Sequence, residues 1–272
     1  MNKCISILIL FILLGSFPAA NALERDRLGL VKQGELSLLT GLQYEEGDYG
    51  TSDSTSLWRI PLSISYRKTN FSLFASVPLL FASSEGDIII SSRPNHGSSG
   101  MSSSTVRNKD EIVSGIGDLV LSGSYYLSPD ARKEIEYRLT AVYKFGTADV
   151  DKGFGTGEDD VSLEAGLVKN IDEYALSGTL GYEISGDTPD FTYHDVFYGT
   201  AGLTKQLAGS KQVGSYLYFS QALTDASKEP LELSFFYYTP TAKTRSLYLF
   251  LSKGLSDGSP DFSLGGSLQF YY

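Results

Sequence analysis

The chain has 272 residues and carries 22 Lys and Arg against 32 Asp and Glu, which gives a formal net charge of −10. This charge makes binding to nucleic-acid phosphates a poor expectation, and we predict no nucleic-acid partner. The single cysteine, Cys4, falls in a segment that we expect to be removed, so we also expect no disulfide, no Cys-ligated metal and no Cys nucleophile.

The first 22 residues have the pattern of a secretory signal peptide. Lys3 supplies a positive charge, residues 5–14 form an almost unbroken apolar run, and Ala20-Asn21-Ala22 gives the small-x-small pattern that signal peptidase reads. No later segment approaches the roughly 20 apolar residues that a transmembrane helix needs. We therefore expect a signal peptide at 1–22 and an exported domain at 23–272.

The exported part alternates apolar and polar residues over segments of about ten residues, which is the period of a transmembrane β-strand. In the first segment, 33–45, Leu36 and Leu38 share one face while Glu35 and Ser37 share the other. Similar segments follow at 56–67, 71–81, 116–127, 135–145, 160–169, 173–184, 195–205, 212–222, 230–239, 243–253 and 261–272. The pattern predicts an all-β fold, a transmembrane antiparallel β-barrel of about 12 strands. A soluble β-sandwich is the alternative, because it alternates too.

Two of these segments, 195–205 and 212–222, carry aromatic residues on both faces, so their facing stays open. The connections alternate between long and short, from 46–55 (long) and 68–70 (short) to 206–211 (short). Outer-membrane barrels place short turns in the periplasm and longer loops outside. Tyr272, after alternating apolar positions, resembles the assembly signal of such barrels. We therefore predict location in the bacterial outer membrane, with its lipid, lipopolysaccharide and the barrel assembly machinery as partners.

Charged residues on the polar faces of the strands would be costly against lipid, so we expect them to line the barrel interior. The predicted lumen residues are Glu35, Arg59, Asp118, Glu136, Arg138, Lys144, Glu164, Glu183 and Glu232. Among them, Asp118, Arg138 and Glu164 suggest an ion-pair ladder, which either braces the lumen or sets the field of a pore. The predicted outer loops are acidic and the predicted turns are basic, so we expect the entrance to repel anions.

The connection at 82–115 is far longer than the others, and loops of this size are usually functional or disordered. It combines the apolar residues Ile88, Ile89 and Ile90 with Arg93 and with Ser/Gly-rich stretches. Because apolar residues favour burial, we predict that this loop forms a constriction or lid from Ile88 to Arg93, acting with the lumen charges Arg59 and Arg138. A disordered surface loop is the alternative.

Two segments resemble a known family. The first, Ser114-Gly115-Ile116-Gly117-Asp118-Leu119, is similar to the G-x-GD-L strand entry of the MetA-pathway-of-phenol-degradation family. The second, Gly254-Leu255-Ser256-Asp257-Gly258-Ser259-Pro260-Asp261-Phe262, is similar to the last extracellular turn of that family. The resemblance implies an outer-membrane barrel that admits small solutes, with hydrophobic or aromatic compounds as candidates. It defines no catalytic residue to carry over, and the long loop at 82–115 is a departure that leaves the ligand class open.

Catalysis and metal binding are the remaining alternatives. His194 with Ser220 is a conceivable pair for an outer-membrane hydrolase, but no third group is placed to orient the histidine. The loop at 149–160 begins like an EF-hand, yet Gly153 and Phe154 stand where a ligand and the required glycine belong. We predict no enzyme, no cofactor and no metal site, while a looser Ca²⁺ site in the acidic loops stays open. The leading function is an outer-membrane channel or transporter for small solutes, with a hydrolase and a non-conducting structural or adhesive barrel as alternatives.

Overall fold

The structure, a computed structural model, describes residues 34–49, 54–84, 112–127, 135–188, 192–225 and 227–272. The predicted signal peptide and the predicted constriction residues Ile88, Ile89, Ile90 and Arg93 lie outside the described residues. The strands are β1 (Glu35–Gly47), β2 (Thr55–Lys68), β3 (Phe71–Ser84), β4 (Val113–Ile116), β5 (Leu119–Tyr126), β6 (Ile135–Phe145), β7 (Asp160–Ile171), β8 (Tyr174–Ile184), β9 (Val196–Gln206), β10 (Gln212–Ser220), β11 (Leu231–Ala242), β12 (Arg245–Gly254) and β13 (Phe262–Tyr271). Within the described ranges, no helix is long and apolar enough to cross a membrane.

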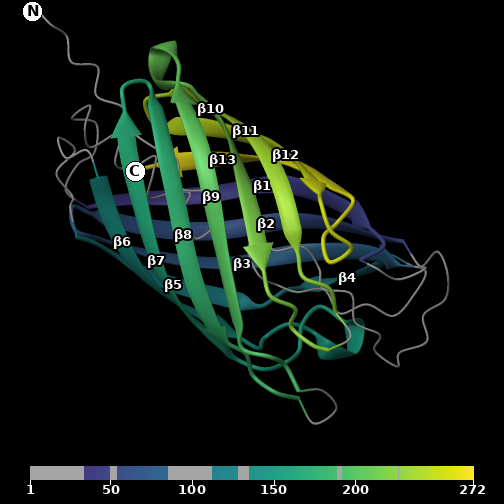
Figure 1. The fold of residues 1–272 in the computed structure, drawn as a ribbon. Helices are drawn as coiled ribbons and strands as arrows, with labels where there is room; N and C mark the ends of the chain where they lie inside the picture. The colour runs from purple at the N-terminus through teal and green to yellow at the C-terminus, as the bar shows by residue number, and fades with distance from the viewer. Residues whose placement is uncertain (1–33, 50–53, 85–111, 128–134, 189–191, 226) are drawn as a thin grey trace, which may run out of the picture.

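The strands form one closed antiparallel barrel (Figure 1). Neighbours along the chain pair with each other, except that β4 and β5 both pair with β3, and β13 pairs with β1 to complete the ring. The ring contains 12 strands, and β4 is an additional one. Closure pairs the edge that a sheet would otherwise expose, which is a requirement where lipid offers the backbone no hydrogen-bond partner. The predicted transmembrane antiparallel barrel is therefore confirmed.

The segment predicted as one strand at 116–127 is split, which corrects the sequence-based boundary. Both β4 and β5 pair with β3, through Leu79–Ile116 on one side of the break and Ser76–Val120 on the other. Two residues separate these pairs on β3 and three separate them on the partner, which is the pattern of a β-bulge. The bulge leaves Asp118 fully buried. Alternation along a strand cannot reveal such an inserted residue.

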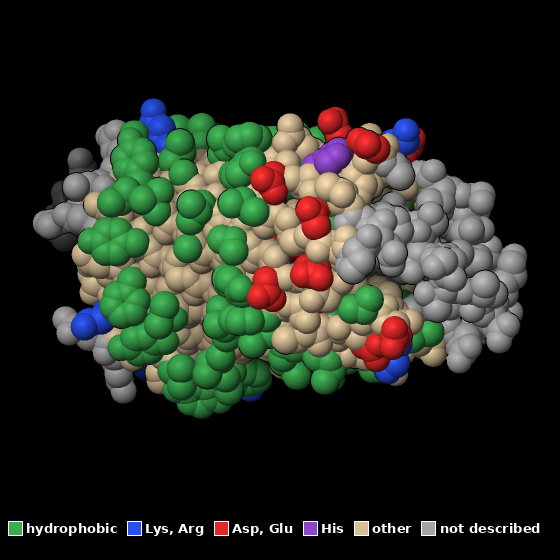
Figure 2. All heavy atoms as spheres, turned by 90° about the horizontal axis from the view of Figure 1, so that it is seen from below, with side chains coloured by type: hydrophobic (Ala, Val, Ile, Leu, Met, Phe, Trp, Pro, Cys, Tyr) green, Lys and Arg blue, Asp and Glu red, His purple; other side chains and the backbone are tan. Residues whose placement is uncertain are grey.

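The two faces of the wall differ in chemistry as the alternation predicts. Leu73 and Leu163 point outward and are 54% and 65% exposed, although both stand within paired strands. Figure 2 shows hydrophobic side chains gathered over this outer wall. Aromatic side chains lie at both ends of the band, with Tyr44, Trp58, Tyr143, Tyr182, Phe197 and Phe262 at one end and Tyr66, Phe71, Tyr125, Tyr137 and Tyr174 at the other. This arrangement is that of a membrane-spanning wall with two interfacial girdles.

The two ends of the barrel differ in their connections. At one end, here the loop end, the strands are joined by the long connections 48–54, 85–112, 146–159, 185–195, 221–230 and 255–261. At the other, the turn end, the connections are 69–70, 127–134, 172–173, 207–211 and 243–244. The chain enters β1 and leaves β13 at the turn end, as expected for an even number of strands. The predicted alternation of long and short connections holds with one exception, because 127–134 at the turn end is one residue longer than 48–54 and 255–261 at the loop end.

A closed barrel of this kind should resist sodium dodecyl sulfate until it is heated. We expect the purified protein to run faster on an unboiled gel than after boiling, because the closed backbone ladder keeps the chain compact. Circular dichroism in detergent should show β-structure in the unboiled sample. A helix-dominated spectrum, or identical mobility before and after boiling, would contradict the fold.

Candidate functional site

The inward face of the barrel is the candidate functional site, because it holds the polar and charged side chains of the spanning strands. Eight of the nine predicted lumen residues are more than nine-tenths buried, and the side chain of the ninth, Glu164, is 9% exposed. Most of the Ser and Thr side chains that share this face are buried as well. The interior is therefore packed with side chains, unlike the wide aqueous lumen of a large porin.

The charges of the interior form separate groups. At the loop end, the Lys144 ammonium lies 2.9 Å from the Asp160 carboxylate and 3.5 Å from that of Asp118. Deeper in the barrel, the Arg138 guanidinium lies 3.9 Å from the Glu164 carboxylate. The Arg138–Glu164 rung of the predicted ladder is present, but Asp118 pairs with Lys144. The antiparallel register explains this, because the loop end of β5 meets the loop end of β6, where Lys144 stands, whereas Arg138 pairs with Tyr126 near the turn end.

Glu164 has a second partner that the sequence did not suggest. The Tyr198 hydroxyl donates a 2.9 Å hydrogen bond to the Glu164 carboxylate from two strands away. Gly181 stands between them on β8, and a Cβ added there would lie 2.3 Å from the Tyr198 ring. The absence of a side chain at Gly181 therefore lets the tyrosine lie along the wall and reach the carboxylate.

The turn end of the interior is a polar network. The Gln269 amide donates to the Ser37 hydroxyl at 2.9 Å, and the Tyr271 hydroxyl donates to the Gln269 carbonyl oxygen at 3.0 Å. The Arg67 guanidinium lies 3.6 Å from the centre of the Tyr126 ring, a cation–π contact. These bonds join β1, β2, β5 and β13 across the inside of the wall. They make the inner face of this end of the barrel polar.

An aromatic cluster lies next to this network on the inner face of the wall. It consists of Leu39, Phe236, Tyr238 and Tyr248, with Tyr216 and Phe250 packed against them. The rings of Phe236 and Tyr248 are stacked with their centres 5.7 Å apart. The sequence analysis missed this cluster because the inward faces of β10, β11 and β12 are aromatic, so the contrast between their two faces is weak. The excess of aromatic residues on both faces was the available signal.

The connection between β6 and β7, residues 146–159, reaches into the interior at the loop end. Phe154 is fully buried and contacts a cluster that includes Leu57, Leu80, Ala82 and Ala148. This is the loop whose sequence begins like an EF-hand. No group of three or more candidate metal ligands occurs among the described residues. The phenylalanine that breaks the calcium motif is the residue that anchors the loop to the wall.

The end of this loop that precedes β7 is also held by hydrogen bonds. Asp159 accepts a 2.6 Å hydrogen bond from the Tyr143 hydroxyl and a 2.9 Å bond from the backbone N–H of Gly146. The first of these bonds, followed by the second, lowers the pKa of the Asp159 carboxyl below its ordinary value. The carboxylate therefore stays charged and bonded in neutral and mildly acidic solution.

The conceivable hydrolase pair is not assembled in the described part of the chain. The His194 imidazole lies 3.4 Å from the exposed Asp225 carboxylate, and the Ser220 hydroxyl donates to the Gln221 carbonyl oxygen at 3.0 Å. Ser220 is buried on the inward face of β10, whereas the His194 side chain is nearly half exposed. This arrangement gives no nucleophile activated by a base.

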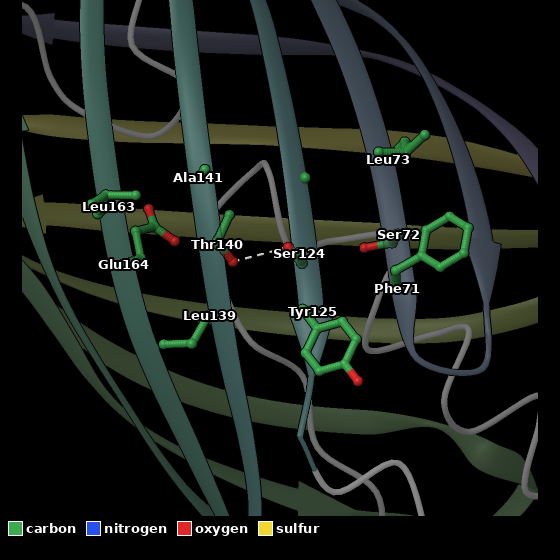
Figure 3. Close-up of a pocket in the computed structure, with 11 residues that line it drawn as sticks. Phe71, Ser72, Leu73, Ser124, Tyr125, Leu139, Thr140, Ala141, Leu163 and Glu164 are labelled. Carbon is green, nitrogen blue, oxygen red and sulfur yellow. Dashed lines mark hydrogen bonds between the residues drawn. The ribbon is translucent and has the colours of Figure 1, made fainter.

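A hollow of about 510 Å³ lies in the outward face over β3, β5, β6 and β7 (Figure 3). It forms where Gly123 and Ala141 carry little or no side chain, and Leu73, Leu139 and Leu163 border it. The hydrogen bond of 2.9 Å between Ser124 and Thr140, dashed in Figure 3, belongs to the inner side of the same wall. The lining of the hollow also includes Ser72, Ser124, Thr140 and Glu164, which belong to the inward face of the same strands.

Comparisons with known proteins agree with this architecture. A family model described as "Putative MetA-pathway of phenol degradation" matches residues 26–270. An outer membrane channel from Pseudomonas putida F1 is similar in structure, with a TM-score of 0.67, 15% sequence identity, and coverage of 89% of this chain and 97% of that one. The NanC porin is similar with a TM-score of 0.50, 11% identity, and coverage of 86% and 98%. No curated protein sequence matches the chain.

Proposed function

The chain belongs to the MetA-pathway-of-phenol-degradation family, and from this premise we propose that it is an outer-membrane channel for small apolar or aromatic solutes. The observation that carries the proposal is the aromatic cluster on the inward face of β1, β10, β11 and β12. A water-filled porin has a polar interior at such positions, whereas stacked rings favour ring-shaped solutes. Each aromatic contact contributes about 0.5–1.5 kcal/mol, which favours entry of a ring and still allows its release.

The acidic loops support the same choice of solute. We take the loop end to face outside the cell and the turn end to face the periplasm. The loop end carries Glu45, Glu46, Asp48, Asp149, Asp151, Glu158, Asp159, Asp187, Asp195, Asp225, Glu229, Asp257 and Asp261. The turn end carries Lys68, Lys169, Lys205, Lys211 and Lys243, and Figure 2 shows acidic side chains toward the loop end. Such an entrance repels anions over about 10 Å and admits neutral solutes.

Other segments of the chain and its surroundings have roles in this channel as well. The nine lumen residues set the field and width of the passage, and Ile88, Ile89, Ile90 and Arg93 narrow its mouth. Residues 1–22 direct export and are removed, and the barrel is assembled by the barrel assembly machinery into lipid and lipopolysaccharide. The chain uses no catalytic residue and no cofactor. These roles are supported by the sequence patterns and by the closed wall. Deletion of the segments or substitution of the named residues tests them.

Replacing Phe236 with Ala should lower the selectivity of uptake for aromatic solutes. Phe236 lies in the aromatic cluster, while its neighbour Phe235 on β11 points outward and is half exposed. Loss of one ring contact should reduce toluene uptake relative to glycerol uptake by about two- to tenfold in proteoliposomes. Phe235→Ala is the matched control and should leave this ratio unchanged. Equal ratios in the two variants would contradict the role of the cluster.

Planar-bilayer recordings test whether the protein conducts at all. Open-channel steps from the purified protein, together with toluene uptake by proteoliposomes, support the channel. A protein that shows the gel shift of a closed barrel but neither conducts nor takes up toluene is a structural or adhesive barrel. Hydrolysis of phospholipid that is abolished by His194→Ala would instead establish the hydrolase.

A further inference from the structure

The loop between β6 and β7 is folded inward by a set of specific contacts. Its short 3-10 helix, η1 (Val150–Lys152), ends at Gly153, which has a left-handed backbone conformation with φ of 72°. Because Gly accepts this conformation without strain, the chain can turn back there. The next residue, Phe154, enters the interior and is fully buried. The loop is therefore folded so that one aromatic ring lies inside the barrel.

Phe154 occupies a socket formed by Tyr49, Leu57, Leu80, Ala82 and Ala148, with Val113 at its edge. We call this group the Phe154 socket. All of its members are apolar or aromatic, and they come from β2, β3, β4 and two loops at the loop end. A site of this composition suits a small apolar ring, since it offers contact area and few polar groups. Its present occupant is such a ring.

The loop packs against residues 114–119, one of the two segments that resemble the family. A Cβ added at Gly115 would lie 2.7 Å from the Phe154 ring, so only glycine leaves room for the ring there. The Asp118 carboxylate accepts a 2.8 Å hydrogen bond from the backbone N–H of Ala148. The backbone N–H of Leu119 donates to the Thr147 hydroxyl at 2.9 Å. Three positions of the motif thus contact three positions of the loop.

A buried lysine side chain holds the base of the loop. Lys144, just before the loop, lies near Asp118 and Asp160 and donates a 3.5 Å hydrogen bond to the Thr156 hydroxyl. The loop backbone also closes tightly, because a Cβ at Gly146 would meet the backbone of Gly157 at 2.3 Å. The base of the loop is therefore held firmly, while the Phe154 ring is held by apolar contacts.

We propose that the Phe154 socket is an entry site for small apolar rings at the loop end, and that Phe154 occupies it until a solute takes its place. The inference rests on the proposed function, since such a site serves a protein that admits apolar solutes. A solute ring makes the same contacts as the phenylalanine ring, so the two compete. Displacement of Phe154 releases the tip of the loop, while the contacts of Asp118 and Lys144 retain its base.

The exchange can be measured without transport, by labelling a cysteine in the socket. Cys4 is the only cysteine of the chain, so a Cys4→Ser background carries no other thiol. Ala148→Cys places a thiol at a buried position of the socket, and a maleimide reports how often the loop opens. Toluene at ten times its apparent dissociation constant should slow the labelling about tenfold, since a toluene ring in the socket covers the thiol and lowers the fraction of time for which the socket is empty. Glycerol at the same concentration should have no effect.

Two control positions separate the socket from general effects of toluene on the barrel. Ala175→Cys lies on the inward face at the turn end, fully buried against Val168, and its labelling should not respond to toluene. Val150→Cys is half exposed on the same loop and should label rapidly with or without toluene. A change in the labelling of Ala175→Cys as well would mean that toluene acts on the whole barrel, which would overturn the proposal.

Substitution of Phe154 should strengthen the protection by toluene. In Phe154→Ala, the socket holds a cavity the size of a ring, and apolar cavities of this kind bind benzene-like molecules. Toluene then meets no competing ring and should protect Ala148→Cys at a lower concentration than when Phe154 is present. The same half-protecting concentration in both backgrounds, or no protection when Phe154 is present, would refute the exchange. A gel shift on heating shows that each variant is folded.

Two glycine variants test whether the segment 114–119 makes room for the Phe154 ring. Gly115→Ala should accelerate the labelling of Ala148→Cys without toluene, because the new methyl group displaces the Phe154 ring. Gly123→Ala is the matched control, since its added Cβ meets only Leu73 at 3.6 Å. Equal labelling in the two variants would contradict the role of the motif. If the labelling behaves as expected but the protein takes up no toluene, the socket stands and the proposed channel fails.

Discussion

Replacing Lys144 with Met should lower the free energy of unfolding by about 3–5 kcal/mol. Lys144 lies 2.9 Å from Asp160 and 3.5 Å from Asp118, and all three side chains are nearly nine-tenths buried or more. Methionine keeps most of the volume but removes the cation, so two carboxylates are left in the interior without their counter-charge. Breaking a buried pair by removing one partner is costly because the remaining charge has lost its compensation.

The matched control for this variant is Lys152→Met in the neighbouring loop. Lys152 lies 3.2 Å from Asp149, but both side chains are more than one-third exposed. An exposed ion pair contributes about 0–1 kcal/mol, so this variant should be nearly as stable as the parent. Denaturant unfolding in lipid vesicles, followed by the fluorescence of the single tryptophan, Trp58, measures both. A loss below 1 kcal/mol for Lys144→Met would contradict the interpretation.

A further variant distinguishes loss of charge compensation from loss of packing. Asp118→Asn and Asp160→Asn, combined with Lys144→Met, remove every charge of the group while keeping its approximate volume. If the stability loss of Lys144→Met comes from uncompensated carboxylates, the triple variant should be more stable than the single one. If packing around the lysine stem is responsible, the triple variant should be at least as unstable.

Replacing Gly181 with Ala should lower the free energy of unfolding by about 2–6 kcal/mol. The added methyl group would lie 2.3 Å from the Tyr198 ring, so the ring has to move. Movement of the ring also breaks the 2.9 Å hydrogen bond from Tyr198 to the buried Glu164 carboxylate. The expected loss combines overpacking of the interior, about 1–3 kcal/mol, with a buried acceptor that has lost its donor, about 1–3 kcal/mol.

Gly178 on the same strand is the matched control. A Cβ at Gly178 meets only the Thr200 carbonyl oxygen, at 3.8 Å, so Gly178→Ala should change the stability by less than about 0.5 kcal/mol. A double-mutant cycle identifies the cause: in a Tyr198→Ala background, Gly181→Ala should cost little, because there is no ring to displace. Equal costs in the two backgrounds would show that the methyl group acts through the backbone instead.

The sequence predicted the wall of this barrel well and its interior contacts less well. The inward position of Glu35, Arg59 and Glu232 follows from alternation alone, because neighbouring side chains of a strand point to opposite faces. The break between β4 and β5 was not predicted, since a bulge adds one residue without altering the composition of the strand. The aromatic cluster escaped for a related reason, because alternation separates faces only where their chemistry differs.

The sequence likewise predicted some features of the candidate site and not others. The sequence indicated that Asp118 and Lys144 face inward, but their pairing depends on the register between β5 and β6. Phe154 was noted only as a departure from a calcium-binding pattern. Its burial depends on a gap at Gly115, which lies far from it along the chain. A residue pattern within one loop carries no information about such a gap.

By itself, then, the sequence determined the strand-by-strand alternation, the order of long and short connections and the sign of the charge at each end of the barrel. These are local properties, set by the geometry of a single strand and by the composition of single turns. Only the tertiary structure decided which charges pair, where the rings gather and which loop enters the interior. Those features depend on register and on contacts between distant segments, where a shift of one residue moves every side chain to the other face of the wall.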